Sequence, residues 1–313
     1  MIVHVPVLLE QVLHYLAPRS PQELLIDATL GEGGHSYAFL SRFRDLSVVG
    51  IDADPEIQAV AKERLAEFGG RMRFYTCWSQ DFFADYPANL EHPDTVLMDL
   101  GVSMYHYEKS GRGFSFSAAE KLDMRLDTAR GFSAAQILAQ RPEKEIADIL
   151  YKNAGERYSR RIARVIAQER RKGAISTAAA LSELVKRAVP AAYRHGPIHP
   201  ATRTMMALRI AVNGELERLP GLLEGALKIL KPGGRLGVIS FHSMEDRVVK
   251  SFFRMKNKDC VCPPQQAVCS CSGLRSVNIL TPKGVTANED EIKRNPPSRS
   301  ARLRVAEKYK GAQ

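Results

Sequence analysis

No run of apolar residues in this chain approaches the roughly 18 that a membrane-spanning helix needs. The apolar N-terminal stretch 1–16 also lacks a basic start and a small-residue cleavage site, and it contains His4, Pro6 and Glu10. These absences argue against a membrane span and a secretory signal peptide, so we expect a cytoplasmic protein. With 313 residues, of which 44% are hydrophobic, the chain should fold around a sizeable core.

Cysteine is scarce, and four of the five cysteines lie in one short segment. Cys77 stands apart and is predicted to be buried. The other four form two pairs with one residue between partners: Cys260 with Cys262, and Cys269 with Cys271. Four thiolates can hold a structural zinc ion, although zinc ligands are usually two to four residues apart. Reduced thiols in a loop and disulfides therefore stay open as alternatives.

Acidic residues are nearly absent from the segment 152–203, which has twelve Lys or Arg, three Glu and no Asp. A second basic stretch, 293–310, has seven Lys or Arg and one Glu. The whole chain has a net charge of +10 and a sequence pI near 9.4. This excess indicates an anionic partner, with nucleic acid first, although a solvated helical face has the same composition.

Strands and helices alternate over the first hundred residues. Four apolar runs have the length and composition of strands: 24–27, 47–52, 71–77 and 94–100. Three segments have apolar residues at helical spacing: 6–16, 36–43 and 55–68. Nearly continuous apolar strands separated by helices are typical of a parallel sheet that is buried on both faces. The predicted fold class is therefore α/β.

The alternation stops between residues 101 and 199, where no segment is predicted to be a strand. Four segments are predicted to be helices: 134–140, 143–153, 156–172 and 178–189. Ser133 and Thr177 are residue types that cap the first and last of these helices. We therefore expect an inserted all-α domain at 104–199, which carries the basic face. The core domain is expected to consist of 1–103 and 200–313.

The sheet pattern resumes after His199. Predicted helices at 201–213 and 215–230 lead through a Lys-Pro-Gly-Gly turn into a strand at 235–240, which a helix at 244–253 follows. The last predicted strands, 277–281 and 301–307, are expected to form a hairpin at the edge of the sheet. The inserted domain would thus follow the fourth strand.

A glycine-rich stretch follows the first predicted strand, with Gly31, Gly33 and Gly34 after Asp27. Asp52 closes the second strand, nineteen residues after Gly33. A glycine loop before a helix, with an acidic residue about twenty residues further on, is the arrangement that holds a nucleoside. The dinucleotide-binding fingerprint is the obvious competitor, but its last glycine position is Ser36 here.

The Leu-Lys-Pro-Gly-Gly-Arg-Leu string before the fifth strand is common in class I S-adenosylmethionine-dependent methyltransferases. Together with Asp27, the glycine loop, Asp52 and Asp99, it gives the chain a close resemblance to that superfamily. The carboxyl ends of parallel strands lie at one edge of a sheet, where such folds bind their ligands. Each carboxylate has the alternative role of a helix cap, but a shared edge disfavours that role for all of them together.

Longer strings resemble one family within that superfamily, in the family's own order from His4 to about Glu307. The strings are DATLGEGGHS (27–36), GIDADP (50–55), LMDLGVS (97–103), RGFSF (112–116), LDMRLD (122–127), GERYSRRIAR (155–164), HPATRT (199–204), ISFHSMEDRVVK (239–250) and NPPSRSARLR (295–304). They resemble the RsmH/MraW family of bacterial enzymes that methylate the N4 amine of a cytidine in the decoding region of 16S ribosomal RNA. The resemblance implies a methyltransferase core with a helical insert after strand four.

The resemblance also implies the cofactor site. The positions that match the family's S-adenosylmethionine contacts are Gly33, Gly34, His35, Asp52, Trp78, Asp99 and His106. Trp78 stands where an aromatic residue usually lies near the adenine, and core packing is its alternative role. His106 stands where the family often has a glutamine, and a histidine can also exchange hydrogen bonds. The resemblance supports no catalytic metal.

The chemistry of N4 methylation suggests one catalytic residue. The N4 lone pair of cytosine is delocalised into the ring, so catalysis must align the amine with the methyl group and accept a hydrogen bond from it. Asp99 is the candidate acceptor. The Asp-Pro-Pro-Tyr string of many amino-methyltransferases is absent, so the base must be held by other groups. Tyr105, Tyr107 and Phe114 can stack on a base or pack within the protein.

Substrate contacts are therefore predicted from several parts of the chain. Arginines of the insert suit phosphate contacts that position RNA without reading its sequence. The predicted substrate-binding residues are Tyr105, Arg160, Arg161, Arg164, Arg203, His242 and Ser243. His242 has a structural hydrogen-bonding role as its alternative. The expected partner is ribosomal RNA or the small subunit, and a homodimer stays among the open oligomeric states. Methylation of DNA or another RNA, and an inactive ribosome-assembly protein, are the competing functions.

Overall fold

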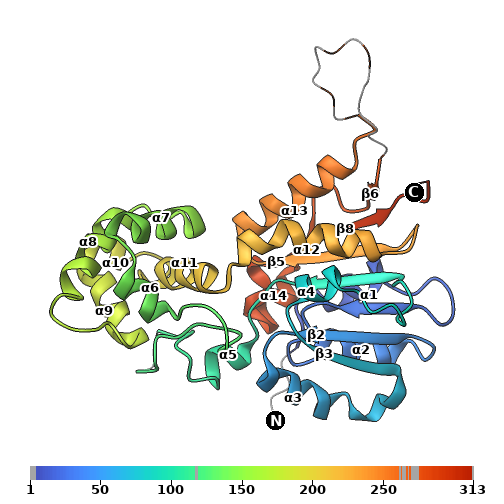
Figure 1. The fold of residues 1–313 in the computed structure, drawn as a ribbon, viewed down its shortest axis with the longest axis horizontal. Coiled ribbons are helices and arrows are strands. Elements are labelled where there is room, and N and C mark those ends of the chain that lie inside the picture. Colours follow the sequence, from blue (N-terminus) through green and yellow to red (C-terminus); the bar gives the residue numbers. More distant parts are fainter. Residues whose placement is uncertain are drawn as a thin grey trace. The chain divides into compact units, whose positions relative to one another are not determined.

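The computed structural model describes residues 5–116, 119–260, 262, 266, 268 and 275–311. The chain forms two compact units (Figure 1). One unit joins the segment up to Val102 with the segment from Arg218 onward, and the other is Ser103–Glu217. The second boundary lies beyond the predicted residue 199, because helix α11 (Thr202–Asn213) packs against α7 (Glu143–Ala154) and α6 (Ala134–Gln140) of the helical unit.

A single mixed sheet forms the centre of the first unit, with strand order β3-β2-β1-β4-β5-β8-β6. The strands are β1 (Leu24–Asp27), β2 (Ser47–Asp52), β3 (Met72–Thr76), β4 (Thr95–Asp99), β5 (Arg235–Ser240), β6 (Val277–Ile279), β7 (Val285–Thr286) and β8 (Arg302–Lys308). Strands β1 to β5 are parallel, whereas β8 is antiparallel to β5, β6 and β7. The predicted fold class, an α/β sheet of the class I methyltransferase type, is confirmed.

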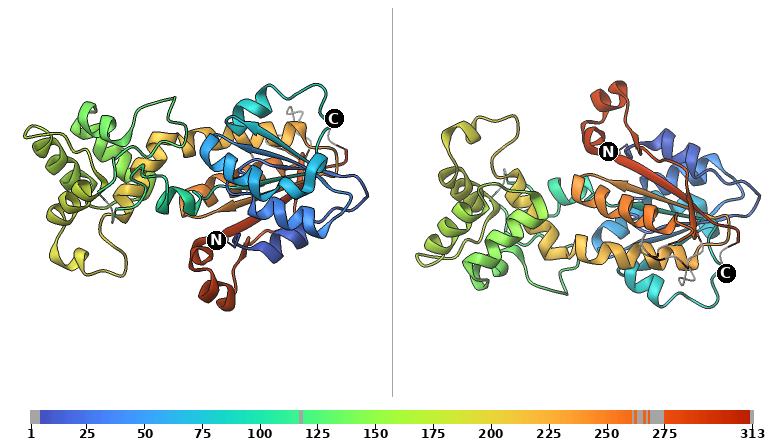
Figure 2. Two further views of the ribbon diagram at one scale, coloured as in Figure 1. Left: turned by 90° about the horizontal axis from the view of Figure 1, so that it is seen from below. Right: turned by 90° about the horizontal axis from the view of Figure 1, so that it is seen from above.

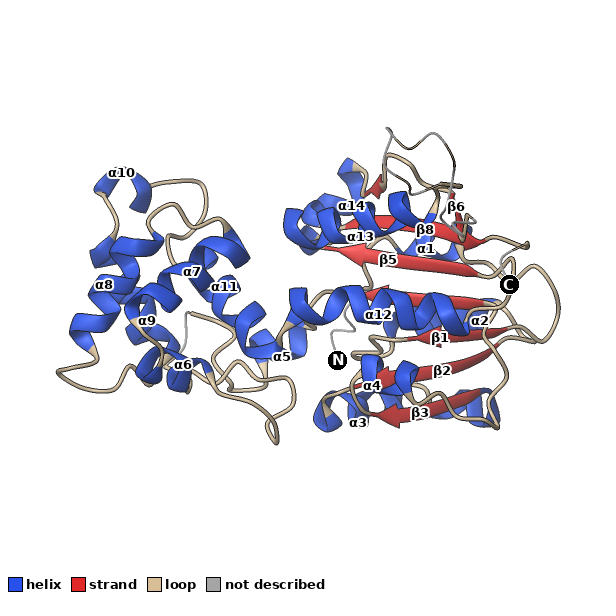
Figure 3. Ribbon diagram, turned by 45° about the horizontal axis from the view of Figure 1, so that its top comes forward, coloured by secondary structure: helices blue, strands red, loops and turns tan. Residues whose placement is uncertain are grey.

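Helices cover both faces of this sheet (Figures 2 and 3). One apolar cluster joins the strands to α1 (Leu9–Tyr15), α2 (Gly34–Arg42) and α3 (Pro55–Arg64), through residues such as Leu13, Phe39 and Ala61. The opposite cluster contains residues of α4 (Ser79–Ala84), α12 (Glu215–Ile229) and α13 (Ser243–Lys256), such as Phe82, Leu223 and Phe253. Burial on both faces explains why the parallel strands are apolar almost throughout.

The two strands predicted to form a hairpin at the end of the chain are neighbours, but no direct turn connects them. Strands β6 and β8 are antiparallel neighbours, but β7, α14 (Glu289–Arg294) and a 3₁₀ helix (Pro296–Ser300) separate them along the chain. Strand β8 lies inside the sheet between β5 and β6 and is buried on both faces. Arg304 is accommodated there because its guanidinium makes two hydrogen bonds, of 2.6 and 3.1 Å, to the carboxylate of Asp246.

The helical unit contains no strand among its described residues, apart from an isolated bridge between Lys121 and Thr177. Its helices are α5 (Met104–Glu108), α6, α7, α8 (Ser159–Glu169), α9 (Ala178–Ala188), α10 (Ala191–Arg194), α11 and the first residues of α12. The predicted caps are present, since Ser133 accepts from the backbone N–H of Gln136 and Thr177 from that of Ala180. Helix α8 begins at Ser159, later than predicted.

The turn between α7 and α8 has a buried carboxylate. Gly155 ends α7 in the left-handed conformation, with φ of 60°, and Glu156 follows it with no exposed surface. The Glu156 carboxylate accepts hydrogen bonds from the backbone N–H of Tyr158 and from the Tyr193 hydroxyl, at 2.9 and 2.8 Å. These bonds fix the start of α8 against α10.

Candidate active site

Three carboxylates meet at one edge of the sheet, at the carboxyl ends of neighbouring strands. Asp27 ends β1, Asp52 ends β2 and Asp99 ends β4. Strand β1 pairs with both of the others, and the chain order reverses between β1 and β4. Ligands of such sheets bind where the strand order reverses. The structure thus brings together the acidic residues that the sequence predicted to share an edge.

The glycine loop between β1 and α2 requires glycine at two of its positions. Gly31 and Gly33 have φ values of 52° and 74°, a region that disfavours other residues. A Cβ on Gly33 would lie 2.8 Å from a methyl carbon of Leu65, and one on Gly34 would lie 2.6 Å from the Pro6 ring. Helix α2 begins at Gly34, so its free backbone N–H groups follow the loop directly.

Asp52 joins the end of β2 to the glycine loop. One carboxylate oxygen accepts the backbone N–H of Gly31 at 2.9 Å, and the other accepts that of Asp54 at 2.9 Å. The side chain is only half-buried. A carboxylate oxygen has more than one lone-pair site, so each oxygen can accept another hydrogen bond. Asp52 therefore suits a ligand with neighbouring hydroxyl groups.

Asp99 is held from the backbone and faces the glycine loop. Its backbone N–H donates to the Thr29 hydroxyl at 2.6 Å, and its Oδ1 accepts the N–H of Gly101 at 3.2 Å. Its Oδ2 lies 3.8 Å from Nδ1 of His35, and 23% of the Asp99 side chain is exposed. A positioned and partly exposed carboxylate of this kind can accept a hydrogen bond from a substrate.

Asp27 is fully buried behind the loop. It accepts hydrogen bonds from the Ser36 hydroxyl at 2.7 Å and from the Thr29 N–H at 3.3 Å. Burial raises the pKa of the Asp27 carboxyl, while the Ser36 hydrogen bond acts in the opposite direction. Asp27 therefore ties β1 to the start of α2.

Trp78 stands at the start of α4, directly after β3. The guanidinium carbon of Arg218 lies 4.2 Å from the centroid of the Trp78 ring. The indole Nε1 is buried and has no hydrogen-bond partner among the described residues. A buried donor without a partner is costly, so it is a group that a bound ligand can satisfy.

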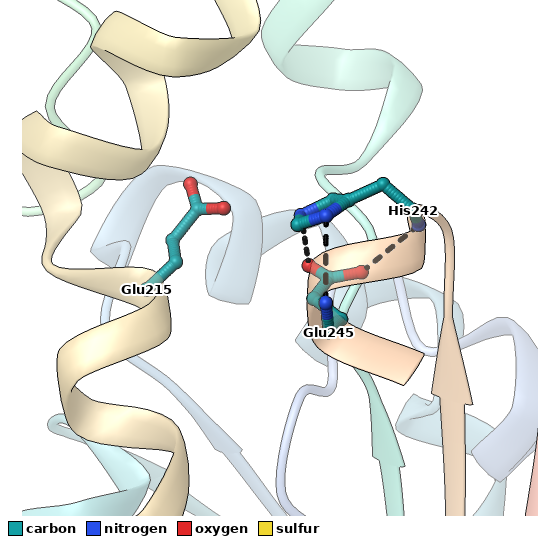
Figure 4. Close-up of side chains that lie close together, drawn as sticks. All are labelled: Glu215, His242 and Glu245. Carbon is teal, nitrogen blue, oxygen red and sulfur yellow. Dashed lines mark hydrogen bonds and ion pairs between the residues drawn. The ribbon is translucent and has the colours of Figure 1, made fainter. Parts of the chain in front are cut away.

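His242 caps helix α13 (Figure 4). The backbone N–H of Glu245 faces its Nδ1 at 3.5 Å, and the Glu245 carboxylate accepts from the backbone N–H groups of His242 and Phe241 at 3.3 and 2.8 Å. The same carboxylate lies 3.0 Å from Nε2 of His242. This geometry is a capping box, so it provides the structural role that the sequence left open for His242. The neighbouring Ser243 is exposed. Neither contact tests a role in substrate binding, which stays a prediction.

Several predicted site residues belong to the helical unit. His106 and Phe114 are buried, with ring centroids 5.1 Å apart, and Tyr105 is half-buried. The Tyr107 hydroxyl lies 3.3 Å from an Nη atom of Arg209. A pocket of this unit is lined by Tyr107, Phe114, Phe116, Met124, Thr202, Met205, Met206 and Arg209. Phe114 therefore packs within the unit and also lines a pocket, so both roles considered for it are compatible with its position.

The basic residues of α8 differ in their surroundings. Arg160, Arg161 and Arg164 are exposed, and Arg164 lies 4.0 Å from the carboxylate of Glu143. Arg170, which directly follows α8, instead donates to the backbone carbonyls of Leu138 and Arg141 at 2.8 and 2.6 Å. Arg170 is therefore less suited to a phosphate contact than the three exposed arginines, because its guanidinium binds backbone carbonyls at the end of α6.

The predicted zinc ligands fall partly outside the described residues. Cys269 and Cys271 are not described, while Cys260 is exposed and Cys262 is half-buried. Zinc binding therefore stays a prediction. Cys77, which was predicted to be buried, is half-buried and packs against the cluster that contains Phe82. Among the described residues, no helix is both long and apolar enough to cross a membrane.

Comparison with known proteins identifies the family. The model of the MraW methylase family matches residues 1–309. The chain belongs to this family. "Ribosomal RNA small subunit methyltransferase H" of Treponema denticola is 53% identical over 98% of this chain and 97% of its own length. The proteins of the same name from Treponema pallidum and Heliobacterium mobile are 40% and 42% identical, over 97% of this chain and 92% and 98% of theirs.

Membership of the MraW family makes the chain a methyltransferase with S-adenosylmethionine as its cofactor, as the sequence predicted. Some residues of the site have no signal in the sequence. The Thr29 hydroxyl accepts the backbone N–H of Asp99, and the Arg218 guanidinium lies over the Trp78 ring. Only the folded chain brings the two residues of each pair together. Phe241 follows β5, and a Cβ on Gly101 would lie 2.6 Å from its ring, so this aromatic side chain stands beside Asp99. In the sequence, only the position of Phe241 directly after a predicted strand could have indicated this role.

Proposed function

We propose that this chain transfers a methyl group from S-adenosylmethionine to the N4 amine of a cytidine in the decoding region of 16S ribosomal RNA. The names of the relatives support the small-subunit RNA as substrate. The observation that carries the proposal is Asp99, a partly exposed carboxylate fixed between the glycine loop and Gly101. A carboxylate at this strand end suits an amine substrate, because the amine has N–H groups to donate to it. A nucleophile without a hydrogen to donate would gain nothing from it.

The residues at the sheet edge fit the cofactor. A Cβ at Gly33 or Gly34 would collide with neighbouring side chains, so the backbone there is packed as closely as only glycine allows. We assign the ribose hydroxyls to Asp52 and the adenine to Trp78, whose buried Nε1 is unsatisfied among the described residues. His35 contributes the backbone N–H at the start of α2. His106 stays assigned to the cofactor from the family resemblance.

The chain's own groups perform the chemistry by positioning. When bound, S-adenosylmethionine supplies a methyl carbon on a positively charged sulfur. Asp99 accepts a hydrogen bond from N4, which draws electron density onto the amine and aligns it for attack. The backbone hydrogen bonds at Thr29 and Gly101 hold this carboxylate in place. Asp99 can also accept the proton that N4 must lose.

The helical unit supplies the phosphate contacts to RNA in this proposal. Arg160, Arg161 and Arg164 are exposed on α8, where they can neutralise phosphates without reading sequence. A cytidine in folded RNA must leave its stack before its N4 can reach a protein site. We assign the remaining contacts to Tyr105, Arg203, His242 and Ser243, as the sequence predicts.

Methyl transfer to isolated small subunits tests the proposal. The protein is incubated with tritiated S-adenosylmethionine and with small subunits, large subunits or duplex DNA. Label is expected in small subunits alone, and nuclease digestion followed by mass spectrometry should place it on N4 of one cytidine. Label in DNA would support an amino-methyltransferase of another substrate. Cofactor binding without any transfer to RNA would overturn the proposal and leave an assembly role.

A further inference from the structure

The His35 side chain points from the end of the glycine loop into the protein interior. Only 6% of His35 is exposed, and its Nε2 lies 3.1 Å from the backbone carbonyl oxygen of Val7. A carbonyl oxygen can only accept a hydrogen bond, so Nε2 must carry a hydrogen. In the neutral ring this leaves the lone pair on Nδ1.

The Nδ1 atom of His35 faces Asp99. Its distance to Oδ2 is 3.8 Å, which is too long for a hydrogen bond. The other carboxylate oxygen, Oδ1, is engaged by the N–H of Gly101. A proton that arrives at Oδ2 would therefore have an acceptor beside it in Nδ1, within a shift of less than an ångström.

Among the described residues, the carboxylates of Asp99 and Asp27 both act on His35 from the neighbouring strands. Asp99 approaches from the end of β4, and the negative charge of Asp27 acts on His35 from the end of β1. On its own helix, the Ser36 hydroxyl points to Asp27 and not to His35. These negative charges would stabilise an imidazolium once a proton had been transferred to His35.

We propose that His35 is a positioning residue for the methyl transfer, which receives through Asp99 the proton that N4 releases. N4 forms its bond to the methyl carbon, the sulfur keeps the electron pair of the broken bond, and N4 gives a proton to Oδ2 of Asp99. That proton then passes to Nδ1 of His35, which leaves an imidazolium beside a carboxylate. The inference rests on the proposed amine substrate.

A purely structural role for His35 makes different predictions. Its bond to Val7 also holds the segment before α1 against the glycine loop, where Pro6 packs on Gly34. A glutamine at position 35 can still donate to Val7, but its amide does not take up a proton near neutral pH. The variant His35→Gln therefore separates the tether from the proton acceptor. His14→Gln, at an exposed position of α1, is the matched control.

The experiment measures single-turnover methyl transfer to small subunits from pH 5 to 9, together with cofactor affinity by calorimetry. For His35→Gln we expect the rate at pH 7.5 to fall by about 10-fold or more, with a Kd for S-adenosylmethionine within about 2-fold. The fall in rate at acid pH should move to lower pH, because in this variant only protonation of Asp99 causes that fall. His14→Gln should match the wild type in all three readouts.

Nitrogen NMR of the His35 ring gives a second readout that needs no activity. In the free wild-type protein Nδ1 should be unprotonated above neutral pH and gain a proton on acidification, at a pH that Asp99→Asn lowers. A rate loss matched by an equal loss of cofactor affinity, a fall in rate at an unchanged acid pH, or an Nδ1 insensitive to Asp99 would overturn the inference. A wild-type protein that transfers no label to RNA would instead overturn the proposed function.

Discussion

Arg218 lies on the face of Trp78, with its guanidinium carbon 4.2 Å from the ring centroid. Arg218 is half-buried near the start of α12, and Trp78 opens α4. The cation fixes the plane of the indole and covers one of its faces. If Trp78 stacks on the adenine, Arg218 is part of the cofactor site through its contact with the tryptophan ring.

Removing this cation is expected to weaken cofactor binding modestly. A cation over an aromatic ring contributes about 0.5–1 kcal/mol, and 1.4 kcal/mol is tenfold in affinity. Arg218→Gln should therefore raise the Kd for S-adenosylmethionine by about 2- to 5-fold in calorimetry. Arg254→Gln, at an exposed position of α13, serves as the control. A Trp78→Ala variant with unchanged Kd would contradict the role of the tryptophan itself.

Asp52 should contribute more, because its carboxylate is the charged acceptor beside the glycine loop. Hydrogen bonds to charged groups are worth about 1.5–3 kcal/mol, so Asp52→Asn is expected to raise the cofactor Kd by about 10- to 100-fold. The variant also loses an acceptor for the Gly31 N–H or the Asp54 N–H. Adenine alone tests the cause, since its weak binding should not change if Asp52 holds the ribose.

Much of this site could be predicted from the sequence, because its residues stand at the ends of apolar strands. Strands β1, β2 and β5 have the predicted bounds. Helix α2 starts two residues before the predicted Ser36, because Gly33 in the left-handed conformation already serves as its cap. The spacing of apolar residues and the positions of glycines reflect burial and turns, so they predict strands and glycine loops reliably.

Bonds between distant parts of the chain leave no local pattern. The sequence could not show that Arg170 would bind two backbone carbonyls while Arg161 stays exposed, since both are arginines on one basic helix or its end. It could not place Arg218 on Trp78 or His35 beside Asp99 for the same reason. Strand β7, with two residues, is too short for any periodicity.

Asp27 makes the stability of the protein depend on pH in a defined direction. Burial raises its pKa from 3.8, so the folded state binds the proton more tightly than the unfolded state. The contribution of this proton to the free energy of unfolding is fully present below pH 3.8. It is lost as the pH rises through the pKa that Asp27 has in the folded protein. Asp27→Asn, which needs no proton to be neutral, should therefore raise the Tm at pH 7.5 and raise it less at pH 4.5.

Scanning calorimetry at the two pH values tests this prediction. Asp45→Asn, at an exposed position, controls for the change in net charge. The amide that replaces the Asp27 carboxylate can still accept from the Thr29 N–H and can donate to the Ser36 hydroxyl, so the packing around it is retained. An equal gain at both pH values would show that the effect does not come from the buried charge.

Asp99 should be essential for transfer and dispensable for folding. General base catalysis contributes about 10²–10⁴-fold, so Asp99→Asn is expected to lower the single-turnover rate by at least about 10²-fold. Its bond to Thr29 comes from the backbone and stays in the variant, so the Tm should change little. Near-normal turnover would remove Asp99 from the mechanism.

The exposed arginines of α8 should determine the salt dependence of RNA binding. Each phosphate contact contributes about 0.7–0.9 to the slope of log K against log salt. Replacing Arg160, Arg161 and Arg164 with glutamine is therefore expected to lower the slope by about 2 to 3 and to weaken binding of small-subunit RNA at low salt. Fluorescence anisotropy from 50 to 300 mM salt measures both quantities.

The control for this variant removes equal charge from the first unit, by replacing the exposed Arg44, Lys62 and Arg73 with glutamine. If α8 touches the phosphates, this control should keep the wild-type slope, because charges that release no counterions on binding do not enter it. Equal losses in the two variants would indicate a general effect of net charge, and an unchanged slope in the α8 variant would show that this helix does not contact the RNA backbone. Cofactor affinity should be the same in both, since neither set includes a residue of the glycine loop or of the carboxylates at the sheet edge.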